Sequence, residues 1–159
     1  MPVNISKFLS QDDVIVDLRI ADKPTLLQEL ARRVADSINV PAEAILLELN
    51  KREQLGSTGM GDGIAIPHAR FAALKAPYGI FARLKPAIDF DAVDGKPVDL
   101  VFLLLVPSSS QGEHLNALAS VARRLRDRAV VEKIRAVRDR ESVYRLMAAE
   151  VQKSGEIIK

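Results

Sequence analysis

A regular spacing of apolar residues predicts a helix near the start of the chain. Its apolar positions lie three or four residues apart: Leu26, Leu27, Leu30, Val34 and Ile38. Asp22 stands where a helix N-cap is expected, Pro24 suits the first turn, and residues 39–41 (Asn-Val-Pro) end the pattern. A second helix is expected to open at Pro41 and to end near Gly56.

Runs of β-branched, aromatic and other apolar residues predict strands over residues 14–18, 64–68, 78–84, 88–90 and 98–106. The run at 64–68 is cut off by a proline, so His68 is expected at the end of a strand. The last run contains the uninterrupted apolar sequence VFLLLV, which indicates burial on both faces. Three further helices are expected: one from about residue 111 or 112, one over 130–137 and one over 142–151.

Helices on both sides of the strands in the chain order predict an α/β fold. The expected architecture is a three-layer α/β/α sandwich, with a single sheet of about five strands and helices on both faces. A chain of 159 residues suits one domain. We therefore expect a single domain over residues 1–159, with an ordered core from about 5 to 152, whereas the strand order cannot be read from the pattern.

Composition narrows the possible functions. The chain has no cysteine, which excludes disulfides, thiolate zinc sites and cysteine nucleophiles. The first residues lack a basic start followed by a long apolar stretch, so no secretory leader is expected. The longest apolar run, residues 100–106, is too short to span a membrane. A cytoplasmic location is therefore expected.

The net charge is only +2, but residues 123–145 contain nine Lys or Arg against four acidic residues. One alternative is that this stretch makes the chain a nucleic-acid-binding module. The charges are, however, interleaved with acids and with Val131, Ile134 and Val137, and no set of aromatic residues accompanies them. That pattern favours the solvated face of amphipathic helices, so no nucleic-acid partner is expected.

The most specific candidate for chemistry is His68. A neutral imidazole is nucleophilic near physiological pH without a separate base, which suits reversible capture of a phosphoryl group. Upstream lies the loop GSTGMGDG, residues 56–63, which has four glycines in eight residues. Such a loop can direct backbone N–H groups at an anion, with help from the hydroxyls of Ser57 and Thr58. The alternative is a surface histidine beside an ordinary turn.

Two more residues are candidates for the same site. His114 falls in the first turn of a predicted helix, where partial positive charge favours an anion. Arg52 closes the second helix directly before the glycine loop, where a guanidinium can neutralise a transferring phosphoryl group. A hydrolase that uses His68, His114 and Asp62 on a metal is a rival, but the chain has no HExxH-type motif, so no metal is expected.

The stretch GSTGMGDGIAIPHAR, residues 56–70, resembles the signature around the phosphorylated histidine of enzyme IIA domains. These domains belong to the bacterial phosphoenolpyruvate:sugar phosphotransferase system, in its fructose/mannitol/nitrogen-regulatory class. The preceding REQLGSTG is similar to the family's arginine-bearing helix end, and GEHLNALASVARRL to its second-histidine segment. The resemblance covers about residues 5 to 150.

This resemblance implies a mixed sheet and a site in which His68 is the phosphoryl acceptor. Arg52 and His114 would be its charged and hydrogen-bonding neighbours, without a metal or organic cofactor. The residues that would bind the phosphoryl group from the loop are Ser57, Thr58 and Gly59. The chain would then be a phosphotransferase component, a phosphohistidine carrier.

The resemblance also implies partners. The expected donor is a histidine-phosphorylated carrier of the HPr type. Within the family the chain is most similar to the nitrogen-regulatory branch, whose members act on targets such as kinases and transporters. The alternative is a sugar-specific IIA subunit that passes the phosphoryl group to a IIB domain. Ala69, where glycine is common in the nitrogen-regulatory branch, bears only on this subclass.

Overall fold

The sheet of the computed structural model is organised around one strand, β6 (Val98–Pro107). β6 pairs antiparallel with β5 (Tyr78–Ile88) and parallel with both β3 (Ile64–Ala65) and β4 (His68–Phe71). β1 (Val14–Leu18) pairs parallel with β5, and β2 (Gly59–Gly61) pairs antiparallel with β3. The result is a six-stranded mixed sheet in the order β1-β5-β6-β3-β2, with β4 also beside β6.

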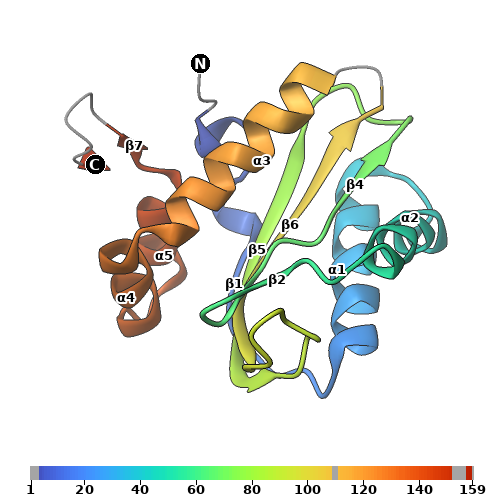
Figure 1. The fold of residues 1–159 in the computed structure, drawn as a ribbon. Coiled ribbons are helices and arrows are strands. Elements are labelled where there is room, and N and C mark those ends of the chain that lie inside the picture. Colours follow the sequence, from blue (N-terminus) through green and yellow to red (C-terminus); the bar gives the residue numbers. More distant parts are fainter. Residues whose placement is uncertain (1–3, 109–110, 152–156, 159) are drawn as a thin grey trace.

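Helices cover both faces of this sheet, as Figure 1 shows. The structure describes residues 4–108, 111–151 and 157–158. One face is covered by α1 (Lys23–Ile38) and α2 (Ala42–Gln54), and the other by α3 (Gln111–Arg126), α4 (Arg128–Ala136) and α5 (Arg140–Ala148). This confirms the predicted three-layer α/β/α sandwich. The remaining elements are the 3-10 turns Ile5–Lys7 and Gln11–Asp13 and the pair β7 (Glu150–Val151) and β8 (Ile157–Ile158).

The residues of β6 alternate between the two cores. Phe102 and Leu104 pack with α3, α4 and α5, whereas Leu103 and Leu105 pack with α1 and α2. These side chains have no exposed surface. The burial on both faces that VFLLLV predicted is therefore confirmed, because helices leave neither face of this strand in contact with water.

Two predicted elements differ from the structure near the site. Residues 64–65 form the whole of β3 and His68 starts β4, with Ile66 and Pro67 between them, so His68 begins a strand and does not end one. Proline has no N–H to donate to a ladder, which explains the break. The carbonyl of Pro67 still accepts a hydrogen bond from Leu104, 2.9 Å long. In addition, β5 continues to Ile88, so residues 78–84 and 88–90 do not form two separate strands.

The helix ends follow the predicted capping chemistry. The carboxylate of Asp22 accepts a hydrogen bond from the Thr25 N–H at 2.9 Å, and Asp139 does the same for Ser142 in front of α5. Asn39 ends α1 in the left-handed conformation, with φ of 59°. None of the helices in the described part of the chain combines the length and the apolar character needed to cross a bilayer.

Two buried arginines attach the C-terminal helices to the rest of the fold. Arg83 of β5 donates to the carbonyls of Ile134 and Val137 at the end of α4. Arg124 of α3 donates to the carbonyls of Leu146 and Ala149 at the end of α5. Carbonyls at helix ends lack partners within the helix, so each guanidinium satisfies groups that folding would otherwise leave unpaired. Part of the basic stretch 123–145 is therefore structural.

A close contact inside the sheet generates a stability prediction. A Cβ atom added to Gly79 would lie 2.7 Å from Cε1 of the buried Phe102 ring. We expect Gly79→Ala to lower the free energy of unfolding in urea by roughly 1–3 kcal/mol, because the core must shift to admit the methyl group. Gly112→Ala is the control, since a Cβ there meets no atom within 4 Å. Equal stability of the two variants would contradict the contact.

Candidate active site

The imidazole of His68 is held in one orientation by the backbone. His68 begins β4, and its Nδ1 lies 2.8 Å from the carbonyl oxygen of Ile66. A carbonyl can only accept a hydrogen bond, so the ring proton lies on Nδ1 and the in-plane lone pair on Nε2. The break between β3 and β4 leaves this carbonyl available for the ring. Nε2 is therefore the nitrogen that can attack an electrophile.

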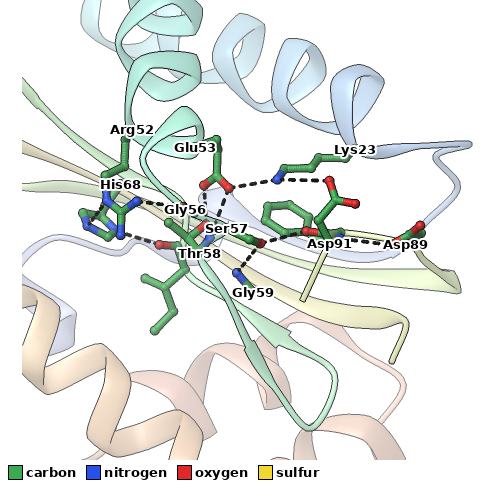
Figure 2. A network of polar contacts seen from close by, with 12 residues as sticks. Lys23, Arg52, Glu53, Gly56, Ser57, Thr58, Gly59, His68, Asp89 and Asp91 are labelled. Carbon is green, nitrogen blue, oxygen red and sulfur yellow. Dashed lines mark hydrogen bonds and ion pairs between the residues drawn. The ribbon is translucent and has the colours of Figure 1, made fainter. Parts of the chain in front are cut away.

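Arg52 lies against this nitrogen. It occupies the last turn of α2, and its Nε donates to Nε2 of His68 at 3.3 Å. Its Nη1 donates to the carbonyl of Gly56 at 2.8 Å, so the guanidinium has two fixed contacts (Figure 2). The structure thus brings together the two residues for which the sequence predicted the acceptor and cation roles.

His114 approaches from the opposite helical layer. It lies in the first turn of α3, and its ring centroid is 5.9 Å from that of His68. Its buried Nδ1 has no hydrogen-bond partner among the residues that the structure describes. The three predicted side chains, on α2, β4 and α3, therefore come together around the ring of His68.

The surroundings of both imidazoles favour the neutral form at pH 7. Burial lowers the pKa of His68 from its ordinary value, and the charge of Arg52 lowers it further, whereas the hydrogen bond to Ile66 and the charge of Glu53 oppose the shift. Burial also lowers the pKa of His114, with smaller effects from His68 and Arg70. A neutral His68 is the form that has a lone pair on Nε2.

The donors of the glycine loop are engaged within the fold. The Ser57 hydroxyl donates to the Phe90 carbonyl at 2.9 Å and accepts from the Gly59 N–H at 3.0 Å. The N–H of Thr58 donates to Glu53 at 3.1 Å, and its hydroxyl donates to the other carboxylate oxygen of Glu53. Direct binding of a phosphoryl group by Ser57, Thr58 and Gly59 therefore stays a prediction, and these contacts give the three residues a role in shaping the loop.

Glu53 is the site residue that the sequence did not single out. Its side chain is 7% exposed and forms an ion pair with Lys23, whose Nζ lies 3.0 Å from a carboxylate oxygen. The available signal was a carboxylate directly after Arg52 and five residues before Thr58. Without the fold, such a residue at a helix end is indistinguishable from a solvated acid.

The site opens into a cavity of about 1310 Å³. Arg52, His68 and the loop residues 57–59 line it, together with apolar side chains such as Met60 and Leu118 and the cationic residues Lys96, Arg126 and Arg128. Asp62 also lines it, but the described residues contain no group of three or more His, Asp or Glu that could hold a metal ion. The cavity can thus admit an anionic group from solvent to Nε2.

Comparison with known proteins gives the family of the chain. The sequence model of the family described as "Phosphoenolpyruvate-dependent sugar phosphotransferase system, EIIA 2" matches residues 7–150. The chain belongs to this family. That match confirms the resemblance to enzyme IIA domains that residues 56–70 indicated. The matched residues include both helical layers and the whole six-stranded sheet.

Similar members of the IIA family carry a regulatory name. The chain is 42% identical over 144 residues to the nitrogen regulatory protein of Bradyrhizobium diazoefficiens, covering 91% of this chain and 94% of that protein. It is 34% identical over 147 residues to the nitrogen regulatory protein of Escherichia coli K12, covering 91% and 90%. The crystal structure of nitrogen regulatory protein IIA-Ntr from Neisseria meningitidis superposes with a TM-score of 0.86 at 35% identity, covering 90% of this chain and 98% of that one.

The site geometry predicts a specific titration. In this IIA protein both ring pKa values should lie below the ordinary histidine value of 6.5, and above its pKa His68 should carry its proton on Nδ1. Since the unfolded chain then binds protons more readily, these two histidines lower stability progressively as the pH falls below 6.5.

Long-range ¹H–¹⁵N NMR across a pH series measures the pKa of each ring and shows which ring nitrogen carries the proton. The variant His68→Gln assigns the signals to the two histidines. A His68 that titrates above the ordinary range, or that holds its proton on Nε2, would contradict the described geometry.

Proposed function

We propose that this IIA protein accepts a phosphoryl group on Nε2 of His68 from an HPr-type phosphohistidine carrier, and that its phosphorylation state controls binding to target proteins. The observation that carries the proposal is the pair of contacts at one ring: the Ile66 carbonyl on Nδ1 and Arg52 on Nε2. The first selects the attacking nitrogen, and the second places a cation where the transferred group arrives.

The chemistry needs no further reagent. As the donor arrives, the Arg52 N–H that contacts Nε2 moves to a phosphoryl oxygen and frees the lone pair. Nε2 of His68 then attacks phosphorus in line while the bond between phosphorus and the donor imidazole nitrogen breaks, and that electron pair returns to the donor ring. His68 keeps its Nδ1 proton, so the phosphorylated ring becomes an imidazolium. The hydrogen bond to Ile66 strengthens as positive charge develops on the ring. The same steps in reverse return the phosphoryl group.

Arg52 and His114 stabilise the charge of the transferred group. The transition state spreads negative charge over the phosphoryl oxygens, and fixed donors around it lower the barrier. Arg52 is fixed by its contact with Gly56 before the donor arrives. His114, in the first turn of α3, adds a ring donor close to the partial positive charge of a helix N-terminus.

Apolar side chains at the site support a docking surface for the donor. Leu55, Val93 and Leu115 are 85%, 79% and 63% exposed, and the last two line the cavity beside His68. Exposed large apolar residues around a charged centre are typical of a transient protein interface. A protein donor therefore suits this site better than a small phosphorylated metabolite.

The regulatory part of the proposal rests on charge. Phosphorylation adds about −1.5 to −2 charges at one side of a cavity that also contains cationic residues, and so changes which surfaces can dock there. The names of the similar proteins favour a nitrogen-related regulatory role. Kinases or transporters are the target proteins that the family resemblance implies. The sugar-specific alternative has the same site and differs in its acceptor, a IIB domain, so transfer from the phosphorylated chain to such a domain distinguishes the two.

The first prediction tests the acceptor. Incubation with a phosphorylated HPr-type carrier should label the wild-type chain and leave His68→Ala unlabelled, because the substitution removes the nitrogen that Arg52 contacts. Phosphorus NMR of the product should show phosphate on Nε2. Labelling of His68→Ala to the wild-type level, or phosphate on Nδ1, would refute the assignment.

The second prediction tests the cation. Arg52→Ala should slow transfer by roughly 10²-fold or more, since removal of a fixed transition-state donor has effects of that size. Lys51→Ala is the matched control: it is the neighbouring cation on α2, and its side chain is 62% exposed and paired with Glu48. Rapid-quench measurement of the two variants beside wild type should separate them, and equal rates would remove Arg52 from the mechanism.

A further inference from the structure

We propose that Glu53 is a positioning residue for phosphoryl transfer: it holds the glycine loop in the shape that keeps Arg52 beside Nε2 of His68. The inference rests on the proposed function, because it assigns Glu53 a part in that same transfer. Glu53 does not contact the ring nitrogen itself. It acts through Thr58 and the loop that follows α2.

Both oxygens of the buried Glu53 carboxylate have hydrogen-bond or ion-pair partners. One oxygen accepts from the Thr58 N–H at 3.1 Å and from Lys23 Nζ at 3.0 Å. The other oxygen accepts from the Thr58 hydroxyl. A carboxylate that is 7% exposed is stable in such a position only when its oxygens are paired, so the side chain and the loop fix each other.

These contacts form a continuous path to the nucleophile (Figure 2). Glu53 fixes Thr58, two residues beyond Gly56. The Gly56 N–H donates to the backbone carbonyl of Glu53 at 3.1 Å, while the Gly56 carbonyl accepts from Arg52 Nη1 at 2.8 Å. Arg52 then reaches His68 Nε2 at 3.3 Å. If Thr58 is released, the Gly56 carbonyl can move, and the guanidinium loses one of its two fixed contacts.

Lys23 anchors the outer side of the same network. Its ammonium lies 4.5 Å from the centroid of the Phe90 ring and 3.7 Å from a carboxylate oxygen of Asp91. The Phe90 carbonyl in turn accepts the hydroxyl of Ser57. The start of α1, residues 90–91 and the glycine loop are thereby tied to one carboxylate, as Figure 2 shows. The position of the loop depends on residues that are distant in the sequence.

Two variants separate the charge of Glu53 from its hydrogen bond to the Thr58 hydroxyl. Glu53→Gln keeps an oxygen that can accept the Thr58 N–H but removes the negative charge, whereas Thr58→Val keeps the charge but removes the hydroxyl. The charge of Glu53 raises the pKa of His68 against the stronger effect of burial. Removing it should move the acid limb of the transfer rate to lower pH, and Thr58→Val should leave that limb in place.

The experiment uses the full chain and a phosphorylated HPr-type carrier. It measures the single-turnover rate at saturating donor and the donor concentration that gives half of that rate. We expect Thr58→Val and Glu53→Gln each to lower the saturated rate about tenfold with half-saturation within about twofold, because a small misplacement of a catalytic group has effects of this order.

Glu48→Gln is the control, since Glu48 is a 37% exposed acid on the same helix, and its rate should equal that of wild type. Glu53→Ala combined with Thr58→Val should be no slower than Glu53→Ala alone, because the two residues act through one contact. If Glu53→Ala does not fold, the two milder variants still decide the question.

The proposal is overturned if both milder variants transfer at the wild-type rate. It is also overturned if only the half-saturation concentration rises, which would make Glu53 a docking residue, or if the acid limb stays in place in Glu53→Gln. A wild-type chain that takes up no phosphoryl group would instead overturn the proposed function, so the two failures are distinguishable.

Discussion

The burial of β6 on both faces is the constraint on which the site depends. Because its side chains alternate between two cores, its register cannot slip by one residue without sending every side chain to the wrong layer. The fixed register of β6 also fixes the position of His68, which pairs with Leu104, and Leu104 belongs to the core under α3. The imidazole is therefore directed toward the layer that provides His114, while α2 provides Arg52 from the other layer.

Electrostatics and burial act together at this position. The two imidazoles are shifted toward the neutral form mainly by burial, and the nearby cations Arg52 and Arg70 add to that effect. The same cations attract the group that a neutral imidazole attacks. A single arrangement thus favours both the reactive form of the nucleophile and the approach of its anionic partner, without any proton having to leave the ring first.

Much of this could be predicted from sequence because it rests on local rules. The cap at Asp22, the end of α1 at Asn39 and the central strand follow from capping preferences and apolar runs, and the phosphohistidine signature drew attention to His68 and Arg52. The roles of Ser57 and Glu53 could not be predicted in this way. The Ser57 hydroxyl donates to a carbonyl 33 positions along the chain, and the buried carboxylate of Glu53 pairs with Lys23, which α1 brings to it.

The interruption at Pro67 has a chemical consequence for a carrier. It releases the Ile66 carbonyl from strand pairing and makes a peptide group, not a carboxylate, the partner of the ring. A peptide dipole orients the imidazole and steadies its proton, but it offers no full counter-charge to a phosphoimidazolium. A carboxylate in that place would stabilise the loaded ring more strongly and make it a slower donor. In the transfer proposed for His68, the neutral partner would favour a P–N bond that breaks readily, which is the property that a reversible relay requires.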